Sequence, residues 1–127
     1  MLSQWRAVSR LLKSFSYALS GIAQVLRRER NMQIHCVATL VVLLGGYTLQ
    51  LSANEWCWVT ACIAAVWSAE LLNTAIEQLT DLVSPNYDKR AGSIKDIAAG
   101  AVLASAIGAA VIGAIIFLPK LYRIFAA

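Results

Sequence analysis

A row of polar side chains interrupts the second long apolar stretch of this 127-residue chain. At about 100° per residue, the spacing i, i+3, i+4, i+7, i+11 places the row on one face of a helix. Its members are Glu70, Asn73, Thr74, Glu77 and Asp81. A carboxylate at membrane depth costs at least ~2.5 kcal/mol, so it is a functional-site hypothesis by default. The row is therefore the first candidate for a site.

The charged groups in and near this row suit phosphoryl transfer. Mg²⁺ prefers one or two carboxylates together with substrate phosphates, and Glu29 and Glu77 are the carboxylates that we expect to hold it. Lys95 could bind phosphate as a point charge. Glu70, deeper by about two helical turns, could accept the proton of a hydroxyl held at headgroup depth. These roles describe transfer from a soluble nucleotide to a lipid alcohol, where positioning and electrostatics supply most of the catalysis.

Residue chemistry alone leaves other classes of function open, because the chain has no Gly-rich Walker loop and no kinase catalytic-loop signature. An ion-coupled transporter would also carry intramembrane carboxylates. It requires a polar path across the bilayer, however, and Trp56 to Trp67 offers only Thr60 as a plainly polar group. A structural network that satisfies the polar row across helices is the third possibility.

Several single residues also have purely structural readings. Asp81 could make only a local hydrogen bond, and Glu29 could pair with the neighbouring arginines. His35 and Trp67 could simply pack between helices. Three tryptophans are expected to be interfacial anchors: Trp5, Trp56 and Trp58.

The composition is that of a membrane protein with one domain, residues 1–127. The chain is 59% hydrophobic and 14% charged, against a usual charged share of about 25%. No short apolar segment with a small-residue cleavage site opens the chain, so we expect no removable signal peptide. Cys36, Cys57 and Cys62 are odd in number and lack paired spacing, which argues against a disulfide framework or a zinc site.

Hydrophobic periodicity predicts an all-α membrane fold. Residues 4–28 form a basic amphipathic helix suited to the membrane surface. The expected transmembrane helices are 31–50, 56–83 and 97–118. A turn over 52–55 separates the first two, and Ser84-Pro85-Asn86 ends the second, because proline disfavours helix in the residue before it. A polar loop over 87–95 leads into the third, which ends before Pro119.

The positive-inside rule predicts the orientation. Residues 4–30 and the 84–96 loop carry nine basic residues, whereas the 50–55 turn carries none and has Glu55. The N-terminus and the second loop are therefore expected in the cytoplasm, with the polar row on the same side, although Lys120 and Arg123 mildly oppose this.

The third span carries small residues spaced by four: Gly100, Ala104 and Gly108. They indicate close helix packing and not a ligand cradle.

Two motifs carry a resemblance to a known family. The run Glu70-Leu-Leu-Asn-Thr-Ala-Ile-Glu77, followed by Asp81-Leu-Val, and the run Lys95-Asp-Ile-Ala-Ala-Gly-Ala-Val102 resemble the signatures of the prokaryotic diacylglycerol kinases. The segment Arg28-Glu-Arg-Asn-Met-Gln-Ile-His35 is similar to the entry to the family's first membrane helix, and Tyr17 and Gly21 also fit. The resemblance covers roughly residues 10–105, and the two motifs together are highly specific.

This resemblance implies an ATP- and Mg²⁺-dependent lipid kinase of the bacterial inner membrane. It implies a homotrimer with three transmembrane helices and a surface helix per subunit, surrounded by membrane lipids and without a nucleic-acid partner. It assigns Glu70 as general base, Asn73 as an active-site amide, and Glu29 and Glu77 as metal ligands, with Glu29 supplied across the subunit interface. The implied nucleotide-binding residues are Arg10, Tyr17, Glu29, Glu77, Asn86, Tyr87, Asp88, Lys95 and Asp96; those for the lipid substrate are Arg10, Glu70 and Ala99.

The chain departs from the proteobacterial type at several positions. Pro85, Asn86 and Asp88 vary in the loop expected to contact adenine. Ala99 stands where proteobacterial members carry a serine, and His35 replaces an acidic residue. The pattern around His35 is similar to the Gram-positive branch, whose members phosphorylate undecaprenol. The acceptor therefore stays open between diacylglycerol and a polyprenol, and the base and metal chemistry is the same for both.

Overall fold

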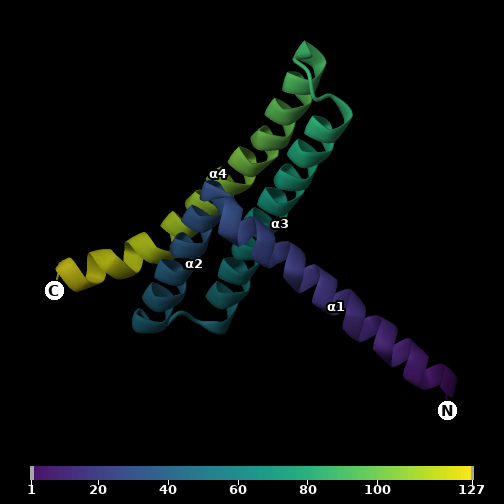
Figure 1. The fold of residues 1–127 in the computed structure, drawn as a ribbon. Helices are drawn as coiled ribbons and strands as arrows, with labels where there is room; N and C mark the ends of the chain where they lie inside the picture. Colours follow the sequence, from purple (N-terminus) through teal and green to yellow (C-terminus); the bar gives the residue numbers. More distant parts are fainter. Residues whose placement is uncertain (1, 127) are drawn as a thin grey trace.

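The computed structural model describes the backbone of residues 2–126 and the side chains of residues 5–126. Over this range the chain is all-helical: α1 (Leu2–Arg28), α2 (Arg30–Thr48), α3 (Ala53–Val83) and α4 (Lys89–Phe125). Helices α3 and α4 lie side by side over much of their length, and α2 lies against the first half of α3 (Figure 1). The expected all-α class and the expected order of four helices are confirmed.

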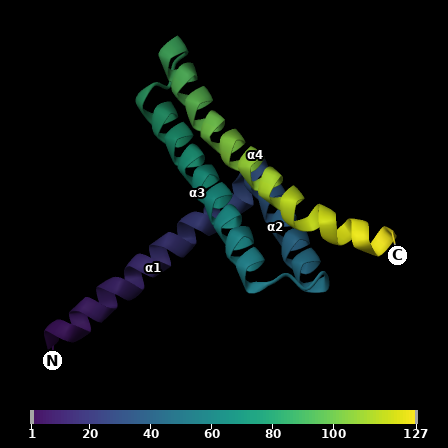
Figure 2. The same cartoon turned by 180° about the vertical axis from the view of Figure 1, so that it is seen from behind.

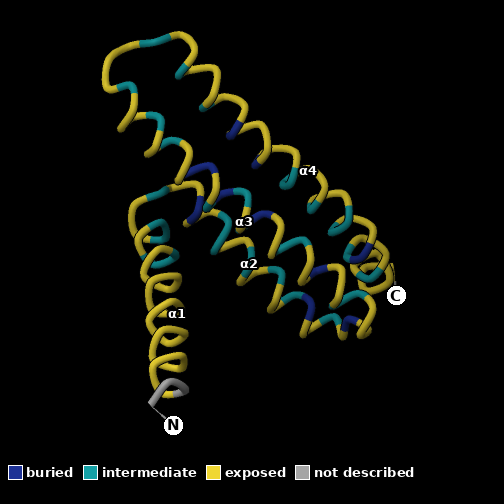
Figure 3. The backbone as a smooth tube through the Cα atoms, turned by 90° about the vertical axis from the view of Figure 1, so that its right-hand side faces the viewer, coloured by how far each residue is buried: buried dark blue, intermediate teal, exposed yellow. Residues whose placement is uncertain are grey.

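Helix α1 leaves the other three helices and crosses the direction of α3, as Figures 1 and 2 show from opposite sides. Its described side chains are exposed from Trp5 to Gly21, and the partly buried ones come only near its C-terminal end, between Ile22 and Leu26. Figure 3 shows the same contrast between α1 and the three-helix part. From Trp5 to Gly21, the apolar face of α1 therefore has no partner within the described chain.

Glu29 forms the corner between α1 and α2. It has extended backbone angles (φ −98°, ψ 118°) and stands at the N-cap of α2 without a capping bond from its side chain. Gln33 stabilises the corner instead: its Nε2 donates to the carbonyl oxygens of Leu26 (3.2 Å) and Arg27 (3.4 Å), which have no partners within α1. The carboxylate of Glu29 is thus left available for another role.

The turn between α2 and α3 is built from two capping motifs. The N–H groups of Gln50 and Leu51 bond back to Tyr47 and Gly46, with Gln50 in the left-handed region at φ 52°, a Schellman arrangement. Ser52 then caps α3 through a reciprocal capping box with Glu55. The turn expected over 52–55 instead lies over residues 49–52, because α2 ends at Thr48 and residues 53–55 already belong to α3.

Helix α4 is longer at both ends than the expected span 97–118. The expected polar loop over 87–95 is wrong from residue 89 onward, because Asp88 caps the helix by accepting from the Arg90 N–H at 2.8 Å. The expected end before Pro119 is also wrong, since α4 continues through this proline to Phe125. As a result Lys120 reaches Glu55 at 3.1 Å. One of the two cations that opposed the predicted orientation is therefore neutralised by an acid of the first turn of α3.

Two of the helices are long and apolar enough to cross a membrane: α3, with a mean hydropathy of 1.5 in its most apolar window, and α4, with 2.6. Helix α2 has 19 residues and does not meet the same criterion. Its first turns carry Asn31, Gln33 and His35, which lower its hydropathy. The membrane character of the chain rests on α3 and α4.

Candidate functional site

The polar row of α3 faces a pocket of about 350 Å³ between α2, α3 and α4. The α3 wall carries Glu70, Asn73 and Glu77, and the other two walls are less polar. The lining residues from α2 are Asn31, Ile34 and His35; those from α4 are Ala99, Val102, Leu103 and Ala106. The structure thus brings the expected base, amide, one expected metal ligand and Ala99 to one place.

Glu70 is the most buried charged residue in the described chain, with 2% of its surface exposed. Its Oε2 has no hydrogen-bond partner, and neither has Oδ1 of Asn73, which is 6% exposed. Buried polar atoms without a partner are uncommon and cost free energy, so such a pair calls for an explanation. Two acceptors beside a pocket are suited to a ligand that brings a hydroxyl proton or a cation.

Glu77 is oriented by its neighbour one turn earlier. Nδ2 of Asn73 donates to Oε1 of Glu77 at 3.1 Å, as expected for residues four apart on a helix. Because the amide nitrogen is used in this way, the carbonyl oxygen of Asn73 is the group left for a ligand. Glu29, His35 and Glu77 are the ionisable neighbours of Glu70.

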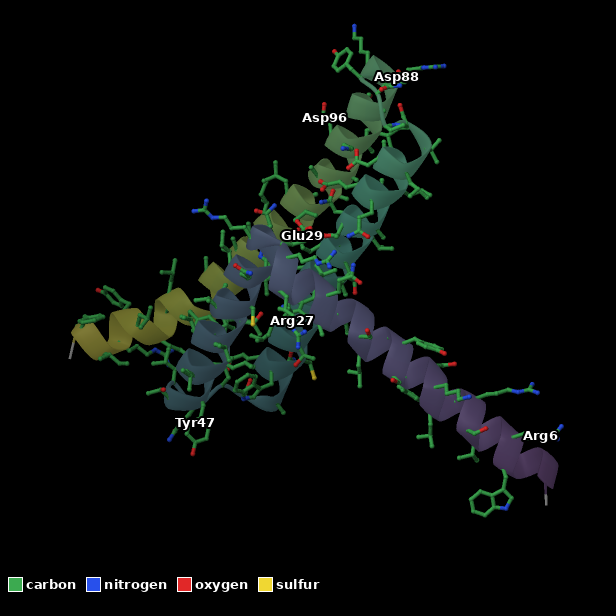
Figure 4. The ribbon with its side chains drawn as sticks, viewed as in Figure 1. Arg6, Arg27, Glu29, Tyr47, Asp88 and Asp96 are labelled. Carbon is green, nitrogen blue, oxygen red and sulfur yellow. The ribbon has the colours of Figure 1, made fainter. Side chains whose placement is uncertain are left out.

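The donor set fits Mg²⁺. Among the residues that the structure describes, no group of three or more His, Cys, Asp or Glu side chains could hold a metal ion by itself. Mg²⁺ needs no such cluster, since it is held by one or two carboxylates plus phosphate oxygens and water. The oxygen donors of the right kind are the carboxylate of Glu77, the free Oδ1 of Asn73 and the carboxylate of Glu29, which makes no capping hydrogen bond. Glu29 lies where the α1–α2 corner meets the bundle (Figure 4).

Lys95 and Asp81 form an ion pair that joins α4 to α3. Asp81 was expected either in the site or in a local bond; the structure gives it a partner on the neighbouring helix. An ammonium group has three donors, so Lys95 can keep this pair and still bind phosphate. Asp96, the next residue of α4, is exposed. Figure 4 shows it on α4, between the site and the loop that contains Asp88.

The loop expected to contact the nucleotide does not line the pocket. Asn86 is exposed and Tyr87 is 97% exposed. The carboxylate of Asp88 is already engaged, because it caps α4 and pairs with Arg90 at 3.2 Å. The side-chain and backbone hydrogen bonds from Arg90 hold the pKa of Asp88 below its usual value.

Arg10 and Tyr17 also lie outside the pocket in this single chain. Both are exposed, on the part of α1 that projects from the bundle. In Figure 4, Arg6 marks the far end of this helix and Glu29 the near end. A role for Arg10 and Tyr17 in nucleotide binding therefore stays a prediction.

Reasoning from sequence overlooked several residues that shape the site. Gln33 holds the corner next to Glu29. Trp67, expected only to pack, donates from Nε1 to Oγ1 of Thr39 on α2 at 3.0 Å. The sequence shows the polar atoms of Thr39 and Trp67 in apolar segments, but no sequence signal pairs them across helices.

Comparison with known proteins gives a consistent result. The family model for prokaryotic diacylglycerol kinase matches residues 16–117. The undecaprenol kinase of Bacillus subtilis (strain 168) is 44% identical over 114 residues, covering 90% of this chain and 93% of that protein. The diacylglycerol kinase of Synechocystis sp. is 37% identical over 118 residues, covering 92% of this chain and 67% of that protein. The diacylglycerol kinase of Escherichia coli (strain K12) is 25% identical over 111 residues, covering 87% and 91%.

Proposed function

The chain belongs to the prokaryotic diacylglycerol kinase family, and from this premise we propose that it transfers the γ-phosphate of ATP to the hydroxyl of a membrane lipid. The observation that carries the proposal is the buried carboxylate of Glu70, whose Oε2 has no partner, beside the free Oδ1 of Asn73. Structural networks leave few buried acceptors unpaired. A site that receives a hydroxyl explains both atoms.

In the proposed reaction Glu70 acts as general base. Its Oε2 accepts the proton of the lipid hydroxyl as the hydroxyl oxygen forms a bond to the γ-phosphorus. The bond from the γ-phosphorus to the β,γ-bridging oxygen breaks, and ADP leaves with that electron pair. Proton transfer to a positioned carboxylate contributes about 10²–10⁴-fold to such a rate.

The remaining polar groups bind and orient the nucleotide. Glu77, oriented by Asn73, and Glu29 would hold Mg²⁺ in the complex with ATP, and the ion would supply charge stabilisation at the phosphates. Lys95 would contact phosphate from α4 while Asp81 holds its side chain against α3.

For the acceptor we propose undecaprenol ahead of diacylglycerol. The 44% identity to an undecaprenol kinase over 90% of this chain supports this order, and the diacylglycerol kinases compared are less similar. The α4 wall of the pocket offers Ala99, Val102 and Leu103, none of which has a side-chain hydrogen-bond donor. A polyprenol has a single polar group and needs no hydrogen-bond donor beyond the hydroxyl site, whereas diacylglycerol also carries ester groups that accept hydrogen bonds.

We further propose that the chain acts as a homotrimer in the bacterial cytoplasmic membrane. With α2, α3 and α4 crossing the bilayer, α1 would lie in the cytoplasmic interface, as its unpartnered apolar face and its crossing direction favour. Three subunits would cover apolar side chains that one chain leaves exposed, and could bring Arg10 and Tyr17 of α1 to a neighbouring site.

The test is transfer of ³²P from γ-labelled ATP to lipid by purified protein in mixed micelles with Mg²⁺. Undecaprenol and diacylglycerol are offered in parallel, and Glu70→Gln is assayed beside the unchanged chain. We expect label in undecaprenyl phosphate, with a loss of about 10²–10⁴-fold in Glu70→Gln. Native mass spectrometry checks that the variant still assembles.

Each other result has a definite meaning. Label in phosphatidate alone would keep the kinase and exchange the acceptor. Substantial transfer by Glu70→Gln would remove Glu70 from the role of base. No label in either lipid, from folded and trimeric protein, would reject the proposal and favour the transporter.

A further inference from the structure

One hydrogen bond between side chains joins α2 to α3 in the described part of the chain. Nε1 of Trp67 donates to Oγ1 of Thr39 at 3.0 Å, and both side chains are partly buried. Oγ1 of Thr39 in turn donates to the carbonyl oxygen of His35 at 2.7 Å. The other side-chain hydrogen bonds of residues 5–126 lie within a helix or turn, or join α1 to α2 or α3 to α4.

This bond lies one helical turn from the Glu70 pocket. Because α2 and α3 are antiparallel, the step of one turn from Thr39 to His35 on α2 and that from Trp67 to Glu70 on α3 lead toward the same end of the helices. The steps are four and three residues, about 6 and 4.5 Å along the helices. His35 and Glu70 line the pocket, and His35, Thr39 and Trp67 line an apolar cavity of about 290 Å³ that shares His35 and Ala106 with it.

The capped turn and the close contact at Gly46 fix α2 against α3 at the end away from the pocket, and few other contacts fix α2 near the pocket. Its buried residues are Met32 and Gly46, near its two ends. Between them its apolar side chains contact surfaces that are as apolar as lipid, so they give little preference for one register over another. A directional bond between a hydroxyl and an indole specifies both the height and the rotation of α2 against α3.

We infer that Thr39 and Trp67 are positioning residues, whose bond fixes α2 against α3 and thereby places the Asn31 and His35 wall opposite the Glu70 carboxylate. The inference rests on the proposed function, because it concerns the geometry of the same pocket. Neither side chain lines that pocket, so both act through the helices that carry them. The bond from Thr39 to the His35 carbonyl oxygen couples it to the turn that carries the His35 ring.

Three conservative variants test the inference. Thr39→Val keeps the shape and removes the acceptor, Trp67→Phe removes the donor, and Thr39→Ser keeps the hydroxyl. We expect the first two each to lower turnover at saturating ATP by about tenfold, since small misplacements of reacting groups are costly. The KM for lipid should rise, and the KM for ATP should change less, since Glu77 and Lys95 are on α3 and α4. Thr39→Ser should resemble the unchanged chain.

The pair and a matched control separate positioning from simple stability. The double variant Thr39→Val, Trp67→Phe should be no worse than the poorer single variant, because both changes remove one and the same bond. Thr48→Val is the control, since Thr48 makes the same bond to a preceding carbonyl oxygen (Leu44, 2.6 Å) but is exposed. It should leave both KM values and turnover unchanged. All rates are expressed per folded protein after size-exclusion chromatography.

The outcomes distinguish the inference from the function on which it rests. Thr39→Val kinetics equal to those of Thr48→Val, a Thr39→Ser variant as impaired as Thr39→Val, or additive losses in the double variant would overturn the inference while the unchanged chain remains an active kinase. An unchanged chain without transfer to any lipid would instead reject the proposed function. Should Thr39→Val yield no folded protein, Trp67→Phe decides, because phenylalanine retains an aromatic ring in the same position.

Discussion

At the scale of single residues, the pocket contains side chains whose surroundings differ sharply. Glu70 is buried with a free oxygen, whereas Glu77 is partly exposed and accepts a hydrogen bond from Asn73. Two carboxylates on one helical face are therefore placed for two tasks. The deeper one suits proton transfer at the lipid hydroxyl, and the more exposed one suits a hydrated cation.

Glu77→Gln tests the cation role. We expect the Mg²⁺ concentration for half-maximal activity to rise at least about tenfold, because a neutral amide replaces one of the two charged ligands. Glu77→Asp, which keeps the charge, should lie between the variant and the unchanged chain. Activity titrated with Mg²⁺ at fixed ATP measures both, and an unchanged titration in Glu77→Gln would remove Glu77 from the metal site.

Lys95 is the second residue whose role can be isolated. Its ion pair with Asp81 is largely solvent-accessible, with side chains 36% and 66% exposed, so the pair contributes little to stability. Lys95→Met should therefore change the free energy of unfolding by at most about 1 kcal/mol, yet raise the KM for ATP at least about tenfold. Lys89→Met, on the exposed first turn of α4, is the control and should leave the KM unchanged. Equal KM values in the two variants would contradict phosphate binding by Lys95.

At the scale of helices, the turn of the α2–α3 hairpin depends on close contact between Gly46 and Trp56. A Cβ atom there would lie 2.7 Å from Cη2 of Trp56, whereas a Cβ on Gly45 would meet its nearest neighbour, Phe117, at 3.6 Å. The two glycines are adjacent in one helix and differ in the space around them. They form a matched pair for measuring the packing of this turn.

Gly46→Ala should lower the free energy of unfolding by about 1–3 kcal/mol, because the rigid Trp56 ring must move. Gly45→Ala should be neutral or stabilising by up to about 1 kcal/mol, since alanine is the better helix former. Thermal unfolding in detergent, followed by circular dichroism, compares them. Equal effects of the two substitutions would show that Trp56 does not pack against Gly46 as described.

At the scale of the whole molecule, the two ends of the helices α3 and α4 carry different charged residues. The loop 84–88 and the start of α4 carry Lys89, Arg90 and Lys95, and the other end carries the paired Glu55 and Lys120. The positive-inside rule, which counts Lys and Arg and not net charge, predicts a cytoplasmic loop 84–88, and the pairing of Lys120 with Glu55 leaves that count unchanged.

This orientation is tested with one cysteine on each side. The three native cysteines are replaced by alanine, and Asn86→Cys and Asn54→Cys are introduced separately at exposed positions. A membrane-impermeant maleimide should label Asn86→Cys only in inside-out vesicles and Asn54→Cys only in right-side-out vesicles. The reverse pattern would place the site outside the cell, away from ATP, and labelling of both positions from one side would contradict a membrane-spanning α3.

Much of this protein is determined locally by its sequence. Periodicity predicts helices over 4–28, 31–50 and 56–83 to within a few residues, because the spacing of apolar side chains is itself a property of the helix. The same geometry places Glu70, Asn73 and Glu77 on one face, and the two motifs around Glu70 and Lys95 indicate the family. None of this needs knowledge of a neighbouring helix.

The tertiary structure decided what depends on neighbours. The sequence did not predict that α4 would begin at Lys89 or pass through Pro119, and the latter brings Lys120 to Glu55. It also did not pair Lys95 with Asp81 or Trp67 with Thr39. Such pairs depend on the height and rotation of one helix against another, and a local pattern of residues leaves both free. Only the packed helices fix them, and with them the pocket in which Glu70 is buried.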